Sequence, residues 1–576
     1  MFKSFRISYL FLAVVLGIAL GMAIDKIFSF DNLRESITKF NDVLTLTEKY
    51  YVEDVDTQKL VVSAINGMLS QLDPHSVYIP PEQLKQVEES FRGDFEGIGI
   101  EFQIVNDTLT VVSAISGGPS EALGIQPGDR IIKIDDNPVI GITNDDVRKK
   151  LRGKAGKEVR VTIIRVGVSK PIEYTIVRDK IPLYSVDTHF MIDDKTGYVS
   201  VSRFAETTYD ELLEALNDLD KKGMKQLVLD LRGNPGGYLN QAVKISDLFI
   251  DDHKKIVYTE GRRKEFDEEY FASNPSKFEN IPLIVLINRG SASASEIVSG
   301  AIQDWDRGLI VGETSFGKGL VQRQFDLPDN SALRLTISKY YTPSGRLIQR
   351  DYKNLKDKSE YYTELDSSNE QEGQNINHTA EQDTSKPEYK TSKGRIVYGG
   401  GGITPDYIVK SDYMTDYTRN LLRKNVFYTF ILSYIDENGE SIKNKYQDDL
   451  IRFKDDFKIT DQMMSSFLKY AASKDVELIK KDFEKDKDYI VARLKAQIAR
   501  NYWKNEGWYS VLLSTDNQYK KALTLFDEAK SLENLKWKDL QFSLEIYSGD
   551  SVFFLIYQVK KLILKSIQRK LKIFSL

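Results

Sequence analysis

The sequence has no cysteine among its 576 residues and only four histidines, at positions 75, 189, 253 and 378. The absence of cysteine excludes disulfide bonds, thiolate metal sites and a cysteine nucleophile. Acidic and basic residues number 85 and 80, so the formal net charge of -5 does not indicate a nucleic-acid partner. The chain is too long for one hydrophobic core, and several domains are expected.

One long apolar run lies at the N-terminus. Lys3 and Arg6 precede an uncharged stretch over residues 7–24, and Asp25 follows it. About 18 apolar residues is near the lower limit for a membrane-spanning helix. We predict a membrane anchor within 1–30, with a cleaved signal or a buried core helix as alternatives. Basic residues before the run favour an inner-membrane anchor with the body in the periplasm or another extracytoplasmic space.

The hydrophobic period changes along the first third of the chain. Over residues 31–93, apolar residues recur at three- and four-residue spacing, which predicts helices interrupted at Pro74. Over 94–180 the period becomes two, with turn residues at Asn106 and Asp107. This second segment is expected to form a compact sheet domain with two short helices.

Strands and helices alternate from residue 181 to residue 350, and the pattern ends over 396–412. Such alternation predicts an α/β core with helices packed on a sheet. The segment 351–395 between these parts is polar, and we expect a disordered or surface-looped insertion. Residues 413–535 are predicted to be helical, and 536–576 to form a basic amphipathic tail.

Three alternating serines occur in the segment "NRGSASASEI", just after a buried-strand pattern: Ser291, Ser293 and Ser295. A serine nucleophile needs a group that takes its proton. No histidine lies near, but Lys318 in "GETSFGKGLVQ" follows another buried strand. A buried lysine acts as a base when its pKa falls towards neutrality. Taken alone, the serines fit helix capping equally well, and Lys318 fits a solvated loop.

A glycine-rich turn, "LRGNPGG" over 231–237, ends a further predicted strand. Glycines let backbone N–H groups approach a ligand closely, as an oxyanion hole requires. A plain tight turn explains the same residues.

These segments, together with "LDPHSVY", "EGIGIEF", "PGDRIIKID" and "YYTPSGRLIQ", resemble the ordered motifs of the carboxy-terminal processing peptidases, or tail-specific proteases. The resemblance runs from residue 37 to residue 350 and resumes at "GGGGITPDY". It implies a multidomain α/β protein with a crotonase/Clp-protease-like protease core, an inserted PDZ domain, an N-terminal helical segment and a C-terminal helical region.

The resemblance also implies roles for individual residues. Ser293 would be the nucleophile of a serine endopeptidase and Lys318 its general base, with Gln322 orienting the lysine amine. The backbone N–H groups of Gly236 and Ala294 would form the oxyanion hole. Ser291 and Ser295 would then have capping or packing roles. No metal and no cofactor is expected.

The sheet domain over 94–180 would be the PDZ module. Its loop Gly97, Ile98, Gly99 and Ile100 would bind the terminal carboxylate of a substrate's apolar tail while the tail adds as a strand. The expected partners are envelope proteins with such tails, the membrane, and a second copy of the chain or an adaptor.

Two other functions would also account for some of these sequence features. One is a catalytically silent PDZ scaffold that binds tails, which the presence of both Ser293 and Lys318 opposes. The other is a hydratase-like enzyme acting on acyl-coenzyme substrates, which leaves the PDZ module and the anchor unexplained. The C-terminal helices fit either an assembly surface or a solvated bundle.

Overall fold

The computed structural model describes residues 32–251, 253–353, 358, 360–363, 373–374, 386–412, 414–446 and 449–532. The predicted anchor, much of the polar insertion and the predicted basic tail lie outside these ranges. Within them, no helix combines the length and apolar character needed to cross a membrane.

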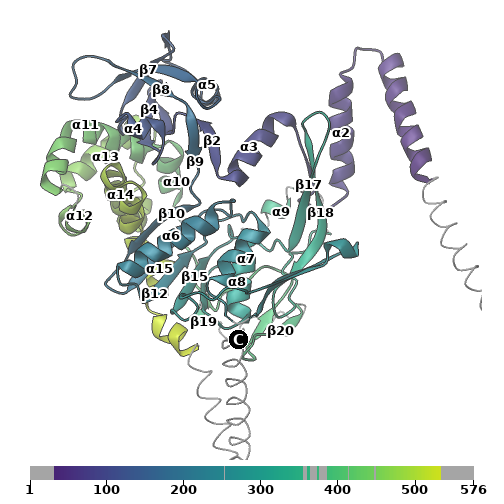
Figure 1. Cartoon of the computed structure of the whole chain (residues 1–576). Helices are drawn as coiled ribbons and strands as arrows, with labels where there is room; N and C mark the ends of the chain where they lie inside the picture. Colours follow the sequence, from purple (N-terminus) through teal and green to yellow (C-terminus); the bar gives the residue numbers. More distant parts are fainter. Residues whose placement is uncertain are drawn as a thin grey trace, which may run out of the picture.

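The N-terminal segment is helical, as its period predicts. A helix over 32–50 and α2 (Thr57–Ser70) stand beside the body of the molecule (Figure 1), and α3 (Pro81–Arg92) leads into the sheet domain. The break at Pro74 holds a short strand, β1 (Val77–Ile79), which the sequence did not predict. This strand pairs with a strand of the α/β core, so the N-terminal segment is joined to the core.

The next domain is the predicted compact sheet with two helices. Its strand order is β3-β4-β5-β7-β8, with β6 paired to β5, so β3 is an edge strand. The turn between β3 and β4 places Asn106 and Asp107 at positive φ, as a tight hairpin requires. The elements are β3 (Ile100–Val105), β4 (Thr108–Ala114), α4 (Pro119–Ala122), β5 (Arg130–Ile134), β6 (Asn137–Pro138), α5 (Asn144–Leu151), β7 (Glu158–Ile164) and β8 (Ile172–Val177). A ribbon of β2 (Asp94–Gly97) and β9 (Asp179–Pro182) connects it to the core.

The core contains a seven-stranded sheet in the order β10-β11-β12-β15-β16-β22-β19. The pairs from β11 to β22 are parallel, and the two outer pairs are antiparallel. Three helices cover one face with a continuous apolar cluster (Figure 1). The strands are β10 (Val186–Met191), β11 (Thr196–Val201), β12 (Gln226–Asp230), β15 (Leu283–Ile287), β16 (Leu309–Gly312), β19 (Gly373–Gln374) and β22 (Tyr407–Ile408), and the helices α6 (Thr208–Lys221), α7 (Leu239–Asp247) and α8 (Ala294–Asp304).

A second, antiparallel sheet stands beside the first. It consists of β13 (Lys255–Gly261), β14 (Glu268–Phe271), β17 (Leu320–Asp326), β18 (Ala332–Tyr341) and the N-terminal β1. The β17–β18 hairpin extends towards the N-terminal helices (Figure 1). The core therefore contains two separate sheets.

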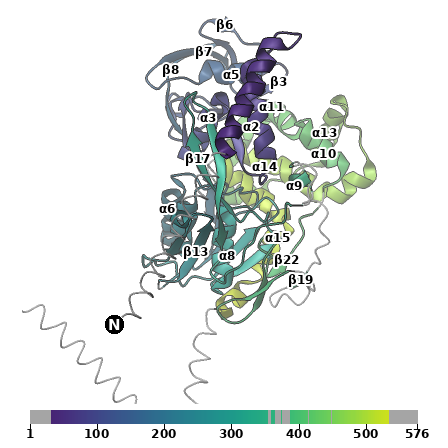
Figure 2. The same ribbon diagram turned by 90° about the vertical axis from the view of Figure 1, so that its right-hand side faces the viewer.

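The C-terminal region is helical, as its pattern predicts. It comprises α10 (Asp416–Arg423), α11 (Val426–Tyr446), α12 (Leu450–Asp456), α13 (Asp461–Ser473), α14 (Lys480–Leu512) and α15 (Asn517–Leu523). α14 is kinked at Trp503 and Lys504. α15 packs on the second face of the seven-stranded sheet, while α10 to α13 lie beside the sheet domain (Figure 2).

Candidate active site

Ser293 stands at the junction between the carboxyl end of β15 and the start of α8. Its backbone has φ 54° and ψ -111°, a conformation that non-glycine residues rarely adopt. The side chain is half-buried and lines a cavity of about 720 Å³. A strained strand-to-helix junction is a setting in which a serine hydroxyl is presented to a substrate.

The two flanking serines hold the turn over 231–237 against this junction. Ser291 Oγ donates to the carbonyl of Leu231 at 2.8 Å, and Ser295 Oγ donates to the carbonyl of Asn234 at 2.9 Å. Both serines are fully buried. Each therefore has a packing role, which is distinct from that of Ser293.

Gly236 lies directly against the candidate nucleophile. A β-carbon added to it would lie 2.7 Å from Ser293 Cβ and 2.9 Å from the backbone nitrogen of Ala294. Ala294 is the first residue of α8, so its N–H has no acceptor within the helix. The N–H of Gly236, however, donates to Asn234 Oδ1 at 2.9 Å. In this conformation the predicted Gly236 donor is engaged within the turn, and its oxyanion role stays a prediction.

Lys318 lines the same cavity as Ser293, from the turn before β17. Burial and, to a lesser extent, the charge of Arg334 lower the pKa of its amine from 10.5 to about 8, against the opposing effects of Glu296 and Asp73. A lysine with this pKa is partly neutral near neutral pH and is able to accept a proton. Within the described part of the chain, no acidic side chain forms an ion pair with the amine.

Glu296 joins the two candidate catalytic residues. Its buried carboxylate accepts hydrogen bonds from the backbone N–H groups of Ser293 at 2.7 Å and Lys318 at 2.9 Å. It also accepts from Gly317 N–H and Ser315 Oγ, each at 2.6 Å. Burial raises its pKa, which these four bonds oppose. Glu296 stands three residues after Ser293, which is capping-box spacing, and the structure adds the contact with Lys318.

Gln322 lines the cavity, four residues after Lys318. Its Nε2 donates to Thr336 Oγ1 at 3.3 Å, and that hydroxyl donates to Asp73 Oδ1 at 2.9 Å. Asp73 also accepts from Ser76 Oγ at 2.6 Å. The motif "LDPHSVY" therefore reaches the site from the N-terminal segment. Contact between Gln322 and the lysine amine stays a prediction.

None of the described histidines lines the cavity of Ser293. His75 is buried nearby, and its burial together with the charge of Lys318 lowers its pKa to about 3. Such a histidine stays neutral and is a weak base. His189 pairs with Asp218 at 3.0 Å, and His378 lies outside the described residues. Lys318 is therefore the best-placed proton acceptor.

Part of the polar insertion is buried beside the site. Tyr361 is fully buried and donates its hydroxyl to the carbonyl of Gly317 at 3.1 Å. Its ring packs edge-on against His75, with ring centroids 5.3 Å apart. The expectation of a disordered or surface-looped insertion is therefore wrong for this residue, because its aromatic ring fills space behind the Lys318 turn.

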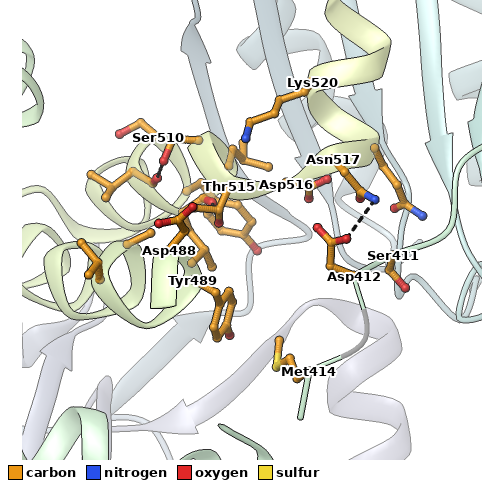
Figure 3. A pocket seen from close by; sticks show the side chains of 18 of the residues that line it. Ser411, Asp412, Met414, Asp488, Tyr489, Ser510, Thr515, Asp516, Asn517 and Lys520 are labelled. Atoms are coloured by element: carbon orange, nitrogen blue, oxygen red, sulfur yellow. Dashed lines mark hydrogen bonds between the residues drawn. The ribbon is translucent and has the colours of Figure 1, made fainter. Parts of the chain in front are cut away.

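A larger cavity, of about 1370 Å³, lies between the C-terminal helices and the core, and neither Ser293 nor Lys318 lines it. Arg232 lines it from the turn over 231–237 and pairs with Asp230 at 2.7 Å and Asp516 at 2.6 Å. Figure 3 shows residues of α14 and of the α15 start facing Ser411, Asp412 and Met414 across this space. Its size does not make it the catalytic cavity, because the candidate nucleophile and base line the smaller cavity instead.

The predicted carboxylate loop lies between β2 and β3. Gly99 has φ 74°, and a β-carbon there would lie 3.0 Å from the Ile181 side chain. Among the described residues, no acceptor is found for the N–H groups of Ile98 and Gly99. Ile100 begins the edge strand β3 and lines a groove between β3 and α5. The loop is thus open to a carboxylate at one end of that groove.

Comparison with protein families identifies four segments. Residues 195–354 match peptidase family S41, and residues 110–165 match the PDZ domain family. Residues 24–83 match the N-terminal domain of the activating protease CtpB. Residues 417–504 match a family of unknown function.

Individual proteins agree with these matches. The chain is 42% identical over 322 residues to the carboxy-terminal-processing protease of Bartonella bacilliformis, covering 55% of this chain and 74% of that protein. It is 38% identical over 313 residues to the carboxy-terminal processing protease CtpA of Bacillus subtilis, covering 54% and 66%. Among solved structures, the photosystem II D1 C-terminal processing protease is 29% identical with a TM-score of 0.30, covering 53% and 88%.

The sequence motifs, the two-sheet core and the extent of these matches lead to one assignment. The chain belongs to the carboxy-terminal processing proteases of peptidase family S41, serine peptidases that here carry a PDZ domain.

Proposed function

We propose that this protease is a membrane-associated endopeptidase with a Ser293–Lys318 dyad, and that it selects substrates by their apolar C-terminal tails. The observation that carries the proposal is the buried Lys318 amine, whose pKa is about 8, in the same cavity as Ser293. A free serine hydroxyl barely ionises near neutral pH, so it needs such a base.

The reaction follows from these positions. Neutral Lys318 takes the proton of Ser293 Oγ as that oxygen attacks a substrate peptide carbonyl. The N–H of Ala294, at the start of α8, and an N–H of the turn over 231–237 stabilise the negative oxygen that forms. The resulting ammonium gives its proton to the leaving amine, and water then hydrolyses the acyl-enzyme.

Tail recognition is assigned to the PDZ domain. The loop Gly97–Ile100 binds the terminal carboxylate, and the tail adds to the free edge of β3. Gln322 would turn towards the lysine amine when substrate is bound.

The location of the enzyme is a further part of the proposal. The apolar run over 7–24 would anchor the chain in the inner membrane, with envelope proteins as substrates. Exposed apolar side chains on the helix over 32–50, such as Leu33, Ile37 and Val43, favour self-association of two copies. Membrane fractionation of the full chain and of a chain lacking residues 1–30 tests the anchor: equal recovery in the membrane would contradict it.

Cleavage of paired model proteins tests the chemistry and the selection together. The two members of each pair differ only in an apolar or a charged C-terminal tail. We expect cleavage of the apolar-tailed member, and a loss of about 10⁴-fold or more in Ser293→Ala and Lys318→Ala. Equal cleavage of both members would contradict tail selection, and an active Lys318→Ala variant would contradict the dyad.

A further inference from the structure

A groove of about 530 Å³ runs along the edge strand of the PDZ domain, between β3 and α5. Its walls are residues 100–104 of β3, and Asn144 and Arg148 of α5. The loop Gly97–Ile100 lies at one end of it. Under the proposed function, this groove holds the last residues of the substrate tail.

One wall residue, Asn425, comes from outside the PDZ domain. It lies in the connection between α10 and α11 of the C-terminal region, with φ 55°. Its side-chain amide donates a hydrogen bond to Gln103 Oε1. Figure 2 shows β3 beside α11, in agreement with this contact.

The position of Asn425 along the groove follows from strand geometry. Gln103 is four residues beyond Gly99 in the carboxylate loop, which at about 3.3 Å per residue is roughly 13 Å. A tail that adds as a strand has the same rise as β3. The tail residue level with Asn425 is therefore about the fourth from the C-terminus.

Further contacts hold the C-terminal region in this place. Arg500 pairs with Glu101 at 2.9 Å, and Lys504, at the kink of α14, pairs with Glu121 at 2.6 Å. Arg130 of β5 pairs with Asp436 of α11. Val105 of the PDZ domain also forms an apolar cluster with Tyr428 and Leu432 of α11. The wall formed by Asn425 is thus fixed relative to β3.

We propose that the C-terminal helical region completes the tail-binding groove, and that Asn425 is a specificity-determining residue for the tail position about four from the end. This inference rests on tail binding by the PDZ domain, as proposed above. It assigns a substrate-selecting role to part of the segment 417–504, whose family has no known function.

Binding of labelled ten-residue peptides to full-length Ser293→Ala protein tests the inference without cleavage. All peptides end in the same three apolar residues and carry Lys or Glu either at the fourth or at the tenth position from the end. In Asn425→Asp, which keeps the side-chain size and tolerates a positive φ, we expect the preference for Lys over Glu at the fourth position to rise about two- to fivefold. The preference at the tenth position should not change.

Asn444→Asp on the exposed surface of α11 is the matched control, and it should leave both preferences unchanged. An unchanged preference in Asn425→Asp, or an equal shift in Asn444→Asp, would overturn the inference while tail binding stands. A further reference peptide ends in three charged residues: if the Ser293→Ala parent binds the apolar-ended peptides no better than this one, the proposed tail recognition fails and the inference fails with it.

Discussion

The two halves of the candidate site are held in different ways. Ser293 lies at the end of a parallel sheet, and its neighbours Ser291 and Ser295 fix it to the adjoining turn by buried hydrogen bonds. Lys318 lies before an antiparallel hairpin whose contacts reach Asp73, more than two hundred residues earlier in the chain. The nucleophile is positioned by contacts within the core, whereas the base also depends on the N-terminal segment.

Glu296 and Tyr340 connect these halves. Glu296 accepts from the backbone N–H groups of both Ser293 and Lys318, and Tyr340 donates its hydroxyl to the Ser293 carbonyl at 3.1 Å. Changes in the N-terminal segment should therefore alter the position and pKa of Lys318 more than they alter the position of Ser293.

Replacing the Glu296 carboxylate should have the largest effect, because this group accepts hydrogen bonds from the backbone of both Ser293 and Lys318. In Glu296→Gln the amide oxygen still accepts, but the –NH2 group that replaces the other carboxylate oxygen cannot, so two of the four donors lose their acceptor. We expect a stability loss of about 3 kcal/mol, measured by chemical unfolding, and a fall in kcat/KM of about 10³-fold. Glu313→Gln changes another buried glutamate, which contacts Ser411, and should keep most activity. Equal activities in the two variants would contradict the bridging role.

Filling the space at Gly236 tests the nucleophile half alone. In Gly236→Ala the new methyl group would collide with Ser293 Cβ and Ala294 N, and the residue has φ 95°. We expect kcat to fall about 10²-fold, because displacement of reacting groups by about 1 Å has this scale. Gly233→Ala is the control, since it also has positive φ but open space around it. A Gly236→Ala variant as active as Gly233→Ala would show that the turn does not adjoin the reaction.

Thr336→Val tests the base half. It removes the hydroxyl that accepts from Gln322 and donates to Asp73, while the side-chain volume hardly changes. We expect about a tenfold fall in kcat together with a shifted pH profile, because the hydrogen bonds that link Gln322 to Asp73 are lost and Lys318 is held less firmly. Thr175→Val on an exposed PDZ strand position should change neither. An unchanged pH profile in Thr336→Val would mean that this hydroxyl does not position the base.

Arg334→Gln should have the smallest effect and should act chiefly through the Lys318 pKa, although it also removes a hydrogen bond to Gln324. The positive charge of Arg334 helps to lower the Lys318 pKa, so its removal raises that pKa and leaves less neutral lysine at pH 7. We expect the midpoint of the activity profile to move to higher pH by about half a unit, a fewfold loss at pH 7. Arg323→Gln on the exposed side of β17 is the control. A shift to lower pH would contradict the electrostatic role.

Much of the core could be predicted from the sequence because its signals are local. The alternating strands and helices, the Asn106–Asp107 turn and the helical C-terminal region all appear in the structure. The strand at Val77–Ile79 could not be predicted in this way, since three residues give no period and pair with a distant strand.

The site was less accessible to sequence reasoning. Spacing alone did not decide whether Ser293 and Lys318 are catalytic or structural, and only the family resemblance singled them out. The contact of Glu296 with Lys318, the hydrogen bonds that link Gln322 through Thr336 to Asp73 and the contact of buried Tyr361 with Gly317 are all long-range. Only the occurrence of "LDPHSVY" among the motifs pointed to the N-terminal segment, without showing what it touches.

The pH dependence of kcat/KM for an apolar-tailed peptide tests the central claim most directly, because it reports the pKa of the essential base in the free enzyme. A Ser293–Lys318 dyad requires activity to be low at pH 6, to rise through a midpoint near the Lys318 pKa of about 8, and then to level off. A midpoint near about 6.5, typical of an ordinary histidine, would contradict the lysine base.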